Sequence, residues 1–236
     1  MTLREVSLVL EAISIAIQAV LVVFLLRGSF RLYPLLLVYC VLQLAATVSE
    51  EYVSRTWGPT SAVFRTLYWS DEVILDLLLF LMVITLIYRA LEGSPMRAGM
   101  GRLLGGVMLI VMVVPFVLFS ARRFSTGWFN GTSQLLNFGA AIMNLGLWTA
   151  LIATRKRDPL LLTVSAGLGI AVTGAAIAFG LRQFTSQGGT LQHLANVFKT
   201  LTYLASVLIW CWAFRPAARK KPASPAAAIS SPSVPS

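Results

Sequence analysis

Hydrophobic residues recur along this chain in seven long stretches that are separated by short polar segments. A helix needs about 20 predominantly apolar residues to cross the hydrocarbon core of a bilayer, and each stretch is long enough to do so. The pattern therefore predicts an all-α, polytopic membrane protein with seven transmembrane helices. The predicted helices cover residues 5–27, 31–54, 61–90, 98–121, 128–154, 159–181 and 190–214.

The composition agrees with this pattern. Hydrophobic residues make up 57% of the 236 positions, and only 12% are charged, whereas a soluble domain carries about 25% charged residues. We expect one transmembrane domain over residues 1–214. The remaining segment, 215–236, begins with basic residues and is rich in Pro, Ala and Ser, so we expect a disordered cytoplasmic tail.

The basic residues predict the orientation of the bundle. Loops at one end of the predicted helices carry about twice as many Lys and Arg residues as loops at the other end. Because basic loops stay in the cytoplasm, we expect an inner or plasma membrane protein with its N-terminus outside and its C-terminus inside. The net charge of +10 is explained by these loops, so we expect no binding to nucleic acid.

Two of the polar residues inside the helices suggest an internal repeat. Glu11 aligns with Asn137 and Gln18 aligns with Asn144, both at an offset of 126 positions. Within each half the two residues are seven apart and share one helix face. The alignment predicts two parallel triplets of helices joined by the fourth helix, a 3+1+3 plan of the kind that transporters use.

Acidic residues concentrate at one depth of the first three helices. Counted from the cytoplasmic ends, Glu11, Asp71, Glu72, Asn137 and Lys199 all lie roughly 20–27 Å along their helices. A charge at this depth costs several kcal/mol unless it is paired or hydrated, so we expect these groups to meet. Seven of the nine acidic residues are Glu5, Glu11, Glu50, Glu51, Asp71, Glu72 and Asp76.

The third and seventh predicted helices hold the densest chemistry. We expect Lys199 to form an ion pair with Asp71 or Asp76 across the bundle. Glu72 and Asp76 are four residues apart, so they share a face and can share a proton. The candidate ligand- or ion-binding residues are Glu11, Tyr68, Glu72, Asp76, Asn137, Asn196 and Lys199.

These residues predict an outward-facing polar cavity, lined by the first, third, fifth and seventh helices, that binds or transports a small solute or ion. The alternative is an accessory or structural subunit, or a sensor, whose acidic end contacts another membrane protein or a second copy. The chain has no hydrolase, zinc-protease or nucleotide-binding motif, so we expect no enzyme activity. One His and two separated Cys residues predict no metal site, and we expect no cofactor.

A third hypothesis is a retinal-type photoreceptor. The run Arg65–Trp69, followed by Asp71 and Asp76, resembles the third helix of the microbial rhodopsins, and Lys199 lies in the seventh helix as their retinal lysine does. The chain departs from that family at Ala195, where an acid is expected four residues before the lysine, and in a sixth helix without an aromatic wall. The 3+1+3 plan also resembles small sugar transporters, but their Pro-Gln signature is absent. Neither resemblance assigns the chain to a family.

Overall fold

The computed structural model is helical throughout the residues that it describes, which are 3–28, 31–92, 97–118, 125–153, 158–183 and 190–215. Within these ranges, only the backbone is described for residues 3–11, 98, 118, 126, 150, 153, 183, 190, 192 and 193. The predicted all-α fold is confirmed, and no strand occurs in these ranges. The seven helices are α1 (Leu3–Leu26), α2 (Pro34–Trp57), α3 (Ala62–Ala90), α4 (Arg97–Leu118), α5 (Thr126–Ala153), α6 (Pro159–Gln183) and α7 (Thr190–Phe214).

Local residues explain where the helices begin and end. The second helix begins at Pro34, three residues later than the pattern predicts, because proline suits the first helical turn, where its missing N–H costs nothing. The same helix ends at Gly58, whose φ of 84° lies in the region that favours glycine. Ser61 then caps α3, since its Oγ accepts a hydrogen bond from the Phe64 N–H at 3.1 Å.

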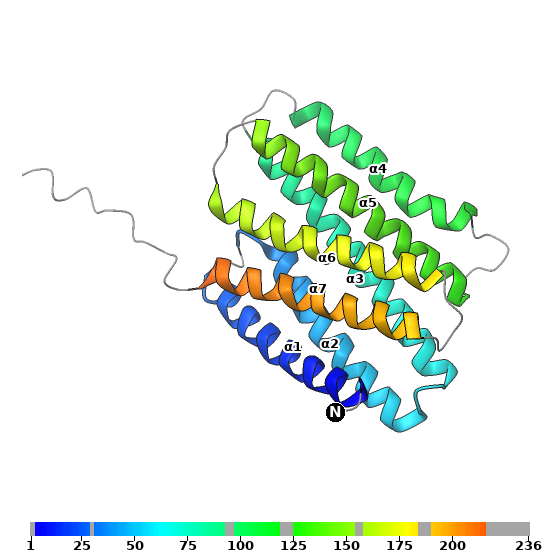
Figure 1. Cartoon of the computed structure of the whole chain (residues 1–236). Helices are drawn as coiled ribbons and strands as arrows, with labels where there is room; N and C mark the ends of the chain where they lie inside the picture. Colours follow the sequence, from blue (N-terminus) through cyan, green and yellow to red (C-terminus); the bar gives the residue numbers. More distant parts are fainter. Residues whose placement is uncertain are drawn as a thin grey trace, which may run out of the picture.

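Six of the helices contact one another in a closed order. The helix α4 lies at the edge of the bundle (Figure 1). Contacts run from α1 to α2, α3, α5, α6 and α7 and then back to α1. The peripheral helix α4 packs only on α3 and α5 among the stronger contacts. The last helix of each triplet contacts the first helix of the other triplet, because α3 contacts α5 and α7 contacts α1. This arrangement agrees with a 3+1+3 plan in which α4 is the connector.

The outer surface of the ring is apolar. Ile142, Leu145 and Ile152 on α5 are each at least 70% exposed, and Val48 on α2 is 66% exposed. A soluble protein rarely leaves so much aliphatic surface in water, whereas lipid chains cover it at no cost. Five helices in the described ranges are long and apolar enough to span a membrane, so the chain is a multi-pass membrane protein with a lipid bilayer around it.

Small residues bring α6 and α7 close together. Gly174 lies directly against Thr202, and Gly167 lies under the indole of Trp210. The buried Trp210 Nε1–H donates a hydrogen bond to the Val164 carbonyl at 3.0 Å. Close approach of this kind is the usual function of glycine in membrane helices, and it fixes α7 in the position from which its polar face reaches α3.

Candidate functional site

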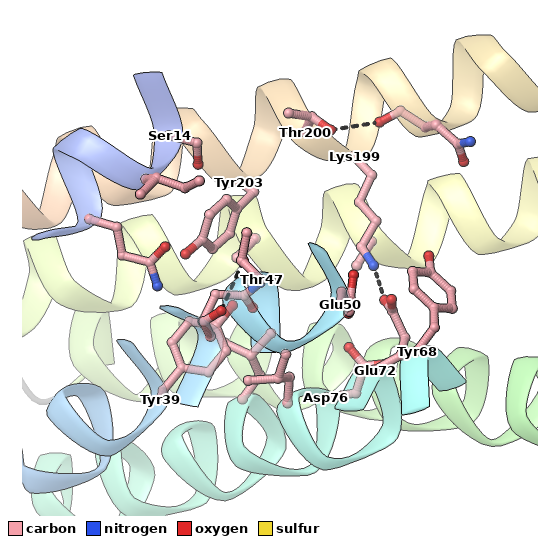
Figure 2. Close-up of a pocket in the computed structure, with 18 of the residues that line it drawn as sticks. Ser14, Tyr39, Thr47, Glu50, Tyr68, Glu72, Asp76, Lys199, Thr200 and Tyr203 are labelled. Atoms are coloured by element: carbon pink, nitrogen blue, oxygen red, sulfur yellow. Dashed lines mark hydrogen bonds and ion pairs between the residues drawn. The ribbon is translucent and has the colours of Figure 1, made fainter. Parts of the chain in front are cut away.

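A cavity of about 350 Å³ opens between α1, α2, α3, α6 and α7 (Figure 2). We expected α1, α3, α5 and α7 to line it, and this expectation is wrong for α5. The cavity is lined by α2 and α6 instead, and no described side chain of α5 contributes to it. The helix α5 lies behind α3 instead. The polar lining residues are Ser14, Gln18, Tyr39, Gln43, Thr47, Glu50, Tyr68, Glu72, Asp76, Arg182, Asn196, Lys199, Thr200 and Tyr203.

An ion pair crosses the cavity. Lys199 extends from α7, and its ammonium group contacts the Glu72 carboxylate of α3 (Figure 2). The ammonium also lies 5.0 Å from the ring centroid of the buried Phe179 on α6, within the range of a cation–π contact. The two side chains remain 27% and 11% exposed, so both ends of the pair face the cavity rather than a dry core.

The carboxylate that meets Lys199 was predicted as Asp71 or Asp76, and the structure corrects this to Glu72. Successive helical residues point about 100° apart, so Asp71 faces away from the direction in which Glu72 faces. Asp76 shares that direction but lies one turn deeper and is only 4% exposed. Glutamate is also longer than aspartate by one methylene group, which helps it to span the gap to α7.

Asp76 lies at the inner boundary of the cavity, where α3 packs on α5. The side chains of Asn137 and Ser133, both on α5, face its carboxylate. Asn137 and Ser133 are fully buried, and the Asn137 Nδ2–H donates to the Ser133 carbonyl at 2.9 Å. The structure therefore brings two predicted site residues, Asp76 and Asn137, together, but Asn137 supports the cavity wall from behind.

Asn196 and Tyr68 form a second polar group at the rim. Both the Nε and the Nη2 groups of Arg182 donate to the Asn196 Oδ1, at 3.1 and 2.7 Å. The Tyr68 hydroxyl group lies beside the same guanidinium. Asn196 is exposed, so this polar group lies at the surface, where it links α6, α7 and α3.

The sequence analysis missed several lining residues. One of them is Arg182, which continues the face of α6 that carries Ala171 and Ala175 at spacings of four and seven. On α2, four lining residues recur at spacings of three and four, which is the signature of one helix face. That signal was available in the sequence, and these residues are Tyr39, Gln43, Thr47 and Glu50.

Glu11 was predicted to join the polar layer, but its side chain lies outside the part of the chain that the structure describes. Its inclusion in the site therefore stays a prediction. Among the described residues no three His, Cys, Asp or Glu side chains gather in a way that would hold a metal ion. Comparison of the chain with protein-family models, with curated proteins and with solved structures found no match.

Proposed function

We propose that this membrane protein transports a small solute or ion, which it binds in the cavity between α1, α2, α3, α6 and α7. The observation that carries the proposal is the ion pair of Lys199 and Glu72, which lines an open cavity instead of being packed between helices. A pair that served only to join α3 and α7 would be as stable without a cavity around it.

The size of the cavity supports this proposal. Pockets for small molecules usually measure about 300–1,000 Å³, and a cavity of about 350 Å³ is near the lower limit. Charged side chains inside a membrane cost several kcal/mol unless they are paired or hydrated. Five such side chains around one cavity are therefore expected to have a function, and they are Glu50, Glu72, Asp76, Arg182 and Lys199.

The charges favour a charged or zwitterionic solute over a neutral one. Lys199 offers an ammonium group, and Glu72 offers a carboxylate beside it. A ligand with one positive and one negative group breaks the ion pair of Lys199 and Glu72 but forms an ion pair with each of them. The two new pairs offset the energy of the contact that is lost. Tyr39, Tyr68 and Tyr203 add hydroxyl groups and aromatic faces to the same wall.

The proposal is tested by thermal unfolding of the purified protein against a panel of amino acids, small carboxylates and small amines. A ligand of the cavity raises the unfolding temperature of the wild type, because it binds only the folded state. The shift is expected to be lost in Lys199→Met and in Glu72→Gln. Glu51→Gln is the matched control and should keep it, since Glu51 forms an exposed pair with Arg55 away from the cavity.

A compound that stabilises the wild type is then tested for uptake into proteoliposomes. Uptake that Lys199→Met abolishes supports transport, whereas binding without uptake supports a sensor. If the compounds that stabilise the wild type stabilise Lys199→Met and Glu72→Gln equally, the ion pair is not part of a ligand site, and the proposal is wrong.

A further inference from the structure

The junction behind the cavity contains three buried polar groups whose hydrogen bonding is incomplete. Asp76 on α3 is 4% exposed, and Asn137 and Ser133 on α5 are 1% and 0% exposed. The two α5 side chains face the Asp76 carboxylate. Even so, the Asp76 Oδ2, the Asn137 Oδ1 and the Ser133 Oγ have no hydrogen-bond partner among the described residues. Buried polar atoms are nearly always paired, so this cluster needs an explanation.

The donors and acceptors of the cluster do not balance when Asp76 is ionised. The acceptors are two carboxylate oxygens and the Asn137 amide oxygen. The donors are the Ser133 hydroxyl and one spare N–H of Asn137, because the other N–H is used by the Ser133 carbonyl. Within the cluster, two acceptors can be satisfied in this way, and one is left over. A proton on Asp76 supplies the missing donor, since a carboxyl O–H can donate to the Asn137 amide oxygen.

The charges around Asp76 do not compensate a carboxylate. On its own helix, Glu72 lies one turn away and already contacts Lys199 of α7. Tyr39 of α2 and Tyr68 of α3 are neutral neighbours. The cation that acts on Asp76 is Arg182 of α6, whose guanidinium bonds Asn196 at the rim. An ionised Asp76 would thus be a buried charge with no contacting counter-ion, which is costly inside a membrane.

We propose that Asp76 is a proton-binding site, in which the carboxyl group is protonated at neutral pH and exchanges its proton through the adjacent cavity. Asn137 and Ser133 are positioning residues that hold the carboxyl O–H. Asp76 lines the cavity, so its proton comes from water there and returns to it. This inference rests on the proposed function, to which it adds a proton as the coupling ion. Asp76 binds its proton whether or not a solute is present, so the two proposals can fail separately.

Infrared spectroscopy of the purified, solute-free protein at neutral pH tests this proposal. The C=O stretch of a protonated carboxyl group is separate from the bands of carboxylates, and it shifts to lower frequency in D₂O. We expect one such band in the wild type and its loss in Asp76→Asn. Asp71→Asn is the matched control, because Asp71 is on the same helix but on a different face from Asp76, and it should keep the band. Ser133→Ala should shift the band without removing it.

The unfolding temperature of each variant, measured in the same buffer, confirms that the protein is folded. No carboxyl band in the folded wild type, or a band that Asp76→Asn leaves unchanged, would overturn the proposal. A different result would also overturn the proposal: no carboxyl band, together with a higher unfolding temperature in Na⁺ than in choline at equal ionic strength. If Asp76→Asn removes this stabilisation by Na⁺, the cluster binds a metal cation instead. Failure of the solute panel has no bearing on either result.

Discussion

Lys199 and Glu72 show how single residues determine the chemistry of this bundle. Each would be costly alone inside a membrane, and their contact across the cavity offsets most of that cost. Their partial exposure leaves both groups within reach of a ligand. The pair therefore has two roles, since it connects α7 to α3 and gives the cavity groups of both signs.

Removing one partner of this pair should destabilise the fold more than removing both charges. We expect Lys199→Met to lower the free energy of unfolding by about 1–3 kcal/mol, because it leaves the Glu72 carboxylate without its counter-ion. The double variant Lys199→Met with Glu72→Gln should recover part of this loss, and a double-mutant cycle of unfolding in detergent measures the coupling. A loss in the double variant equal to the sum of the two single losses would show that the two side chains do not interact.

The exposed pair of Glu51 and Arg55 provides the contrast. Their side chains are 59% and 78% exposed and lie four residues apart on α2, with a distance of 2.5 Å between Oε1 and Nε. Exposed pairs of this type contribute about 0.3–0.5 kcal/mol. Glu51→Gln is therefore expected to change the unfolding temperature little in the same assay, and a loss as large as that of Lys199→Met would contradict this account of burial.

At the scale of residues, the sequence predicts which polar side chains lie at the same depth, but not which of them are in contact. Depth and spacing placed Lys199, Glu72 and Asp76 in one layer of the bundle. They did not distinguish Glu72 from its acidic neighbours as the contacting group, because that choice depends on side-chain length and on the rotation of α3 relative to α7. Arg182 was missed because the sixth predicted helix ends at residue 181, one position before it.

At the scale of helices, the contact between α6 and α7 holds the site in place. Gly167 and Gly174 remove the side chains that would separate the two axes, and Trp210 fills the space above Gly167. The abundance of glycine in α6 is a sequence signal for this close packing. The sequence also predicts the helix bounds to within a few residues, because apolar length, proline and glycine are local signals that need no tertiary information.

A methyl group at Gly167 should separate the two helices. An added Cβ would lie 2.5 Å from the Trp210 Nε1, where the indole donates its hydrogen bond to Val164. We expect Gly167→Ala to lower the free energy of unfolding by about 1–3 kcal/mol, the usual cost of overpacking. Gly146→Ala is the control, since nothing lies within 4 Å of its Cβ position. Thermal unfolding of both variants should show a loss for Gly167→Ala alone, and equal behaviour would contradict the proposed close contact.

At the scale of the whole molecule, five helices, α1, α2, α3, α6 and α7, surround the cavity, and α4 and α5 lie outside them. The sequence predicted the seven helices, but it placed the wrong helix, α5, in the cavity wall. The order of helices around a ring depends on long-range packing, which hydrophobic spans alone do not encode. The polar stripe on α2 carried the missing information, because four polar residues on one helix face are too costly to point at lipid.

The orientation of the molecule in the membrane is a prediction of the basic loops and is tested by labelling. We expect a cysteine introduced by Thr60→Cys, in the exposed turn between α2 and α3, to react with an impermeant maleimide from outside the cell. Ser231→Cys, in the C-terminal segment, should react only after the membrane is opened. The native Cys40 is buried and Cys211 is half-buried within α7, so we expect a low background. The reverse labelling pattern would contradict the predicted orientation.

Native mass spectrometry of the protein, released from mild detergent, tests the central claim most directly. The account predicts a bound species of small, defined mass in the wild type and in Glu51→Gln, and its loss in Lys199→Met and Glu72→Gln. The same bound mass in all four proteins, or no bound mass in any of them at saturating concentrations of every compound in the panel, would contradict a ligand site at the Lys199–Glu72 pair. A covalent retinal adduct on Lys199 would contradict it as well and would identify a photoreceptor.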